Sequence, residues 1–145
     1  MTLGVNCHDF PWSAPVYFVY HQGIFYFFSN PMSRHILNAS DNQKTSSSIF
    51  NDSDKMDQIY GIQMNGVLTS KIKMPLYIDI VRQYVLKFNF LEIAFGARVW
   101  TDKNFFMEKF KSRLYGFMPE KVYLSDNSRP RDKRLKIDLP ITLGS

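Results

Sequence analysis

The sequence contains one cysteine, Cys7, among its 145 residues, so no intramolecular disulfide can form. It also contains only three histidines, His8, His21 and His35, and no recognisable tetrad of metal ligands. We therefore expect a fold that is held together by packing, with neither a disulfide nor a bound metal.

Long apolar runs are absent as well. No stretch of the chain approaches the length needed to cross a bilayer. The chain has no positively charged start followed by a long apolar run, the pattern of a signal peptide. We therefore predict a cytoplasmic protein that lacks a signal peptide and has no membrane partner.

The common catalytic and nucleotide-binding motifs are missing. The chain has no Gly-x-Gly-x-x-Gly, no Walker loop and no His-Glu-x-x-His. It also lacks Gly-x-Ser-x-Gly, so a hydrolase nucleophile elbow is not indicated. No residue is selected by these patterns as a catalytic acid, base or nucleophile.

The composition is that of a globular protein, and the length favours a single domain over residues 1–145. Aromatic residues make up 16% of the chain, with 13 Phe and 8 Tyr, which favours strands. The net charge is +5, and much of the basic excess lies in a tail from about residue 128, interpreted as solvated. No motif interleaves aromatic and basic residues, so we expect no nucleic-acid partner.

Short β-rich runs dominate the first half of the chain. The segment "HQG" separates two of them and predicts a tight hairpin turn, while "HDFPW" predicts a turn nearer the start. The run Ile24–Ser29 is almost entirely apolar and should be buried on both faces. The predicted strands are Thr2–Cys7, Ser13–His21, Ile24–Ser29, Thr45–Phe50 and Tyr60–Lys73, the last with a bend or bulge at its glycines.

Helices are expected at Ser33–Ser40, with Ile36 and Leu37 facing inward, at 75–90 and at Asp102–Lys111. A strand pair with a kink at Pro119 is expected over Arg113–Ser125, and the segment 91–100 has no clear period. The fold class is therefore mainly β with inserted helices. Six or so antiparallel strands that must hide their edges predict a small six-stranded barrel.

The triplet Ser33-Arg34-His35 stands where a strand gives way to a helix. A hydroxyl, a guanidinium and an imidazole at a helix start suit an anion such as a phosphate. The same residues also fit an ordinary Ser cap with two exposed neighbours. The triplet by itself leaves both interpretations open.

Two further positions are unusual for strands. Pro15, within Ala14-Pro15-Val16, removes a ladder donor and predicts an edge or an interruption, where exposed backbone can bond a flat polar ligand. Gln63 places an amide in an apolar strand, where it can donate and accept hydrogen bonds. A plain edge-strand Pro and a satisfied strand Gln are the alternatives.

Taken together, "PWSAPVYFVYHQGIFYFFSNPMSRHILNA" resembles the pyridoxamine 5'-phosphate oxidase-like family of FMN-binding split barrels. The later segments "YGIQMNGVLTSKI" and "RLYGFMPEKVYLSDNS" are similar to the family's next long strand and closing strand pair. The resemblance covers about residues 12–127. It implies a six-stranded antiparallel split β-barrel, a homodimer with FMN at the subunit interface, and flavin redox chemistry with a nicotinamide donor or other small-molecule substrate.

The resemblance also implies which residues hold the cofactor. By this comparison the FMN phosphate is held by Ser29, Ser33, Arg34 and His35, and the ring lies along Ala14, Pro15 and Val16, with Gln63 as a further contact. Unlike the oxidase itself, the segment 14–18 carries no Arg or Lys, so the substrate is not implied. The family often begins with a helix before the first strand, and this chain looks short there.

A second hypothesis keeps the fold and changes the role. The chain can be a non-enzymatic protein that binds a flavin, a deazaflavin or heme. Heme requires an axial ligand, for which the candidates are His8, His21 and His35.

Overall fold

The computed structural model describes residues 1–8, 10–39, 44–129 and 134–139. Eight strands form one antiparallel sheet in the order β2-β1-β5-β6-β7-β4-β3, and β8 pairs with β7. The strands are β1 (Thr2–Cys7), β2 (Phe10–Pro15), β3 (Val19–His21), β4 (Ile24–Ser29), β5 (Thr45–Phe50), β6 (Tyr60–Thr69), β7 (Arg113–Asp126) and β8 (Leu135–Ile137). The helices are α1 (Arg34–Leu37), the 3-10 turn η1 (Met56–Gln58), α2 (Met74–Lys87), α3 (Phe90–Phe95), α4 (Arg98–Thr101) and α5 (Phe105–Phe110).

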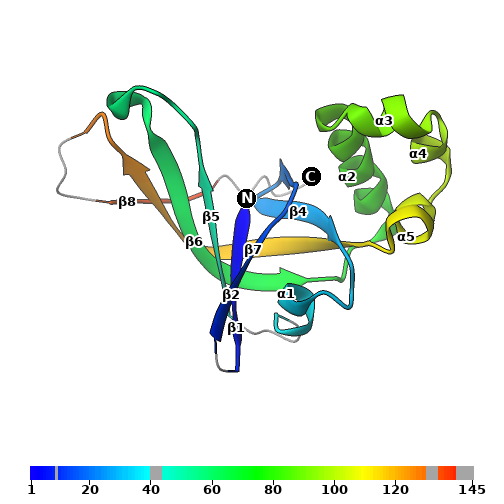
Figure 1. Cartoon of the computed structure of the whole chain (residues 1–145), viewed down its shortest axis with the longest axis horizontal. Helices are drawn as coiled ribbons and strands as arrows, with labels where there is room; N and C mark the ends of the chain where they lie inside the picture. Colours follow the sequence, from blue (N-terminus) through cyan, green and yellow to red (C-terminus); the bar gives the residue numbers. More distant parts are fainter. Residues whose placement is uncertain (9, 40–43, 130–133, 140–145) are drawn as a thin grey trace.

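Helices α2 to α5 form a group on one side of the sheet, at the right of Figure 1. The strand ends of β5, β6 and β8 reach away to the left, and α1 lies near the β1–β2 hairpin. Two apolar cores result. One lies against the helices and includes Tyr26, Ile80 and Phe105. The other lies on the opposite face of β4 and includes Phe27 and Phe117.

The hairpin and the double burial of β4 are confirmed. Gln22 and Gly23 have φ values of 49° and 83°, the left-handed pair of a two-residue hairpin turn, and His21 pairs with Ile24. Phe27 is fully buried in one core while Tyr26, next to it, is buried in the other. The apolar run at Ile24–Ser29 therefore serves both faces of the sheet.

The mainly β class is confirmed, but the count of six strands is wrong. The predicted strand Ser13–His21 divides after Pro15 into β2, which pairs with β1, and β3, which pairs with β4. Proline lacks the N–H that would continue the ladder. Among the described residues, β2 and β3 do not pair, so the sheet is curved but not closed. This architecture is consistent with a split-barrel-like fold.

The expected bulge is present where β6 meets β7. Pairing shifts between Asn65 and Gly66, and Gly66 lies opposite Pro119. A Cβ at Gly66 would meet the carbonyl oxygen of Met118 and come within 2.9 Å of the Pro119 Cα, so only glycine fits. The predicted strand pair over Arg113–Ser125 is a single strand, β7, and the bulge that absorbs its extra residue lies beside Pro119, where the kink was predicted.

Several local predictions are also corrected. The expected turn at "HDFPW" is shorter, since Phe10 already belongs to β2, and Leu37 is 53% exposed rather than inward. The long strand stops at Thr69. The unassigned segment 91–100 is helical, in α3 and α4. The predicted solvated tail contributes β8, and the predicted helix end at residue 40 lies outside the described residues.

Within the described residues, no helix combines the length and the apolar character needed to span a bilayer. The cytoplasmic location stays a prediction.

The position of Phe27 gives a test of the packing. Phe27→Ala should lower the free energy of unfolding by about 3–5 kcal/mol, because it empties a fully buried site beneath β4. Phe10→Ala is the matched control, since Phe10 is 75% exposed and its loss should change stability by less than about 0.5 kcal/mol. Denaturant unfolding of both variants measures the difference, and equal losses would contradict the assignment of Phe27 to the core.

Candidate functional site

The predicted phosphate-binding residues lie at the junction of β4 and α1. Ser29 is the last residue of β4 and is buried, with 8% of its surface exposed. The chain then turns at Asn30, whose side-chain oxygen accepts a hydrogen bond from the Met32 N–H at 2.8 Å and whose carbonyl accepts one from the Ser33 N–H at 3.0 Å. This turn brings Ser33, at the start of α1, back toward Ser29.

Three of the predicted side chains meet in one cluster. Ser29 Oγ lies 2.8 Å from His35 Nε2 and 3.2 Å from Ser33 Oγ. The Ser33 hydroxyl donates to the Asn30 carbonyl at 2.7 Å. One arrangement uses every proton: His35 Nε2–H donates to Ser29, Ser29 donates to Ser33, and Ser33 donates to the Asn30 carbonyl. We call Ser29, Ser33 and His35 the hydroxyl–imidazole cluster.

The cap prediction for α1 is only partly correct. Ser33 occupies the N-cap position with extended backbone, φ −69° and ψ 145°. Its hydroxyl makes no capping bond to the helix and donates to the Asn30 carbonyl instead. Because α1 spans only four residues, the donors of this cluster are side chains rather than a helix dipole.

Burial lowers the pKa of His35 below its usual value of 6.5, because partial desolvation disfavours the imidazolium. His35 is therefore neutral at pH 7 and contributes a neutral donor or acceptor, not a fixed charge. The positive charge of the site rests on Arg34.

Arg34 is adjacent to the cluster but points toward β2. Its guanidinium carbon lies 4.5 Å from the ring centroid of Trp12, a cation–π contact. Stacking occupies the face of the guanidinium and leaves its N–H groups, which lie in its plane, able to donate to an anion. Sequence reasoning gave Trp12 no binding role, and no local pattern links two residues so far apart in the chain.

Strand β2 ends at Pro15, and Val16 follows it. As the proline predicted, β2 is an edge strand of the sheet. Ala14 is buried and pairs with Leu3, while Pro15 is exposed and pairs with Thr2. The backbone of Val16 was expected to be free. Instead, its N–H donates to the Met1 carbonyl at 2.9 Å. A ligand would therefore meet the outer edge of β2 rather than a gap in the ladder.

Gln63 is not brought to the hydroxyl–imidazole cluster within one chain. It is exposed on β6, paired with Ser48 on β5 and Tyr123 on β7. The cluster instead lies beyond the end of β4.

The candidate heme ligands lie in different surroundings. His8 is exposed on a turn with φ 22°, and His21 Nδ1 lies 2.9 Å from the Gln83 side-chain nitrogen. An aromatic cleft of about 310 Å³, lined by Tyr17, Phe28 and Phe106 among others, is large and apolar enough for part of a planar ligand. Among the described residues, no histidine lines this cleft.

Comparisons with known proteins support the fold. No protein-family model matches the chain, and no curated protein matches its sequence. Among solved structures, a heme binding protein from Mycobacterium smegmatis superposes with a TM-score of 0.66 and 14% identity over 94% of this chain and 51% of that protein. The chain thus spans about half the length of that protein.

Two other similar structures are covered more fully. HutZ, the heme storage protein from Vibrio cholerae, matches with a TM-score of 0.58 and 17% identity over 86% of this chain and 84% of its own. An FAD-binding protein from Mesorhizobium loti matches with a TM-score of 0.52 and 14% identity over 85% and 82%. At these identities the likeness shows a split-barrel-like fold, and membership of the pyridoxamine 5'-phosphate oxidase-like family stays a prediction.

The lowered pKa of His35 predicts a pH-dependent stability. At pH values between the pKa of His35 in the folded chain and its usual value of 6.5, the unfolded chain binds more protons than the folded chain. The contribution of His35 to the free energy of unfolding is therefore fully present above pH 6.5 and is lost as the pH falls through the folded-state pKa. Denaturant unfolding at about pH 7.5 and about pH 5.5 should show a loss at the lower pH that His35→Gln reduces. An imidazole resonance of His35 that titrates above 6.5 by NMR would contradict the prediction.

Proposed function

We propose that this chain binds FMN through its phosphate at the hydroxyl–imidazole cluster and Arg34. The observation that carries the proposal is the convergence of Ser29 Oγ, Ser33 Oγ and His35 Nε2 within 2.8–3.4 Å of one another, beside a stacked guanidinium. Two hydroxyls, an imidazole and a guanidinium are a donor set suited to a phosphate.

A bound phosphate would take part in the hydrogen bonds that the cluster makes within itself. The hydrogen bonds among Ser29, Ser33 and His35 join side chains only, and in each of them a phosphate oxygen would replace the present acceptor. A bound dianion would also raise the pKa of His35 and so offset the effect of its burial. Arg34 would donate from the edge of its guanidinium while Trp12 holds its face.

The other predicted contacts, from Ala14, Pro15, Val16 and Gln63, are those to the flavin ring. Helix α1 contacts β1 and β2, so the phosphate donors lie beside the edge strand whose last residue is Pro15. The outer edge of β2 would orient the ring. Because one subunit leaves Gln63 away from the cluster, we propose a homodimer in which Gln63 reaches the ligand from the second subunit.

With FMN bound, the cofactor would supply hydride and electron transfer, which makes a flavin-dependent oxidoreductase with a nicotinamide donor or small-molecule substrate the proposed activity. The chain's own residues would bind and orient the cofactor, and we assign no residue as a proton donor. The expectation that nucleic acid is not a partner stays a prediction.

A second candidate is a non-enzymatic role in which the fold binds heme or a flavin. The fold similarity to proteins named as heme-binding and heme storage proteins favours it. The donor set argues for the first candidate, because hydroxyls and a guanidinium recognise a phosphate, whereas heme iron requires an available axial ligand.

Arg34→Ala should weaken FMN binding roughly ten- to a hundred-fold, the effect of removing a charge-assisted hydrogen bond. Arg134→Ala is the matched control, because it removes the same charge from an exposed position in the basic tail. Titration of the protein with FMN, followed by flavin fluorescence, measures both. Equal affinities of the two variants would exclude Arg34 from the phosphate site.

The dimer has its own test. Sedimentation equilibrium at micromolar concentration should give twice the 17.0 kDa mass of the chain. Gln63→Ala should leave that mass unchanged and weaken FMN binding, since Gln63 is exposed in one subunit. A single species of one chain's mass that still binds FMN would contradict the shared site.

A further inference from the structure

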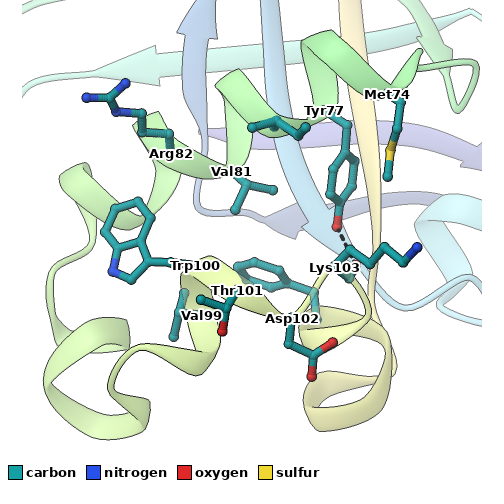
Figure 2. A pocket seen from close by; sticks show the side chains of 11 residues that line it. Met74, Tyr77, Val81, Arg82, Val99, Trp100, Thr101, Asp102 and Lys103 are labelled. Carbon is teal, nitrogen blue, oxygen red and sulfur yellow. Dashed lines mark hydrogen bonds between the residues drawn. The ribbon is translucent and has the colours of Figure 1, made fainter.

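A second cavity lies among the helices, away from the hydroxyl–imidazole cluster. It has a volume of about 360 Å³, lies between α2, α4 and α5, and shares no residue with that cluster. Figure 2 shows Arg82 and Trp100 at one end of the cavity, and Met74 and Lys103 at the other. Its volume is in the range of small-molecule sites.

The walls of this cavity are apolar. Val99 and Phe106 are 2% and 4% exposed and form its buried part, with Val81 beside them. The indole N–H of Trp100 donates to a Glu92 carboxylate oxygen at 2.9 Å, which fixes the ring at the mouth. An aromatic or aliphatic group of a ligand would therefore find a preformed surface.

The charges at the mouth are unbalanced. Arg82 and Lys103 both line the cavity and are exposed, and neither forms an ion pair with any residue in the described ranges. The acidic residue of the lining, Asp102, is already engaged, because it pairs with Arg98 at 3.3 Å and accepts the Asn104 N–H at 2.9 Å. The cavity thus offers apolar walls with free positive charge.

The hydroxyl groups of the lining add little to this charge pattern. Tyr77 donates toward the Lys103 carbonyl over 3.5 Å, shown as the dashed line in Figure 2, and Thr101 donates to the Ala97 carbonyl at 3.1 Å. Both hydroxyls therefore have acceptors in the chain. Among the lining residues, the group with unused directional donors is the Arg82 guanidinium, which matches a carboxylate in a bidentate geometry and extends outward from α2 at the end of the cavity (Figure 2).

We propose that this cavity binds a small aromatic carboxylate, with its ring against Val99, Phe106 and Trp100 and its carboxylate on Arg82. The apolar wall would supply the affinity, and the guanidinium would select the anion over a neutral ligand of the same shape. The site is independent of the FMN proposal, because it uses other residues and another part of the fold.

Calorimetric titration with 2-naphthoate tests the site, and 2-naphthamide, which has a similar shape and no charge, is the matched ligand. We expect saturable binding of the naphthoate with a dissociation constant below about 1 mM, and binding of the amide at least about tenfold weaker. Equal binding of the two ligands would overturn the role of the carboxylate, and no saturable binding of either would overturn the site.

Two variants assign the binding to the cavity. Arg82→Gln should weaken naphthoate binding at least about tenfold and leave naphthamide unchanged, whereas Lys121→Gln, the same charge loss on β7, should change neither. Thr101→Phe should abolish binding by filling the cavity from an exposed position. Naphthoate affinity that survives both Arg82→Gln and Thr101→Phe would overturn the proposal.

Discussion

The structure depends on the burial of β4 on both faces. Phe27 is fully buried in one core and Tyr26 is buried in the other, so this strand joins the curved sheet to the helical layer. The stacked rings of Phe28 and Phe106, with centroids 3.7 Å apart, extend that contact to α5. Because β4 is held from both sides, its last residue, Ser29, has a fixed position, and the cluster with Ser33 and His35 is built on that position.

The sequence predicted the elements whose signals are local. The left-handed pair Gln22–Gly23 and the apolar run after it specify a hairpin and a doubly buried strand, and Pro75 marks the first turn of α2. The strand count was wrong because it depends on pairing. Whether Ser13–His21 is one strand or two is decided by the partners β1 and β4, which are remote in sequence, and β8 exists through its pairing with β7.

The same distinction holds for the candidate site. Ser29, Ser33 and His35 are close in sequence, and their meeting follows from the turn at Asn30. The contact of Arg34 with Trp12 joins two segments that are distant in sequence, so no local sequence pattern could predict it. The position of Gln63 away from the cluster likewise could not be predicted, because it depends on the strand order. Because burial lowers the pKa of His35, its imidazole is neutral at pH 7, and Arg34 is the residue of the site that carries a positive charge.

The central claim is that the hydroxyl–imidazole cluster and Arg34 hold a flavin phosphate, and an absorption spectrum tests it most directly. The purified chain is incubated with FMN in one sample and with heme in another, and excess ligand is removed before each spectrum. Flavin bands should be retained in the first sample, whereas riboflavin, which lacks the phosphate, should not be retained under the same conditions. A chain that releases FMN but retains a heme Soret band would contradict the account and favour the heme-binding role.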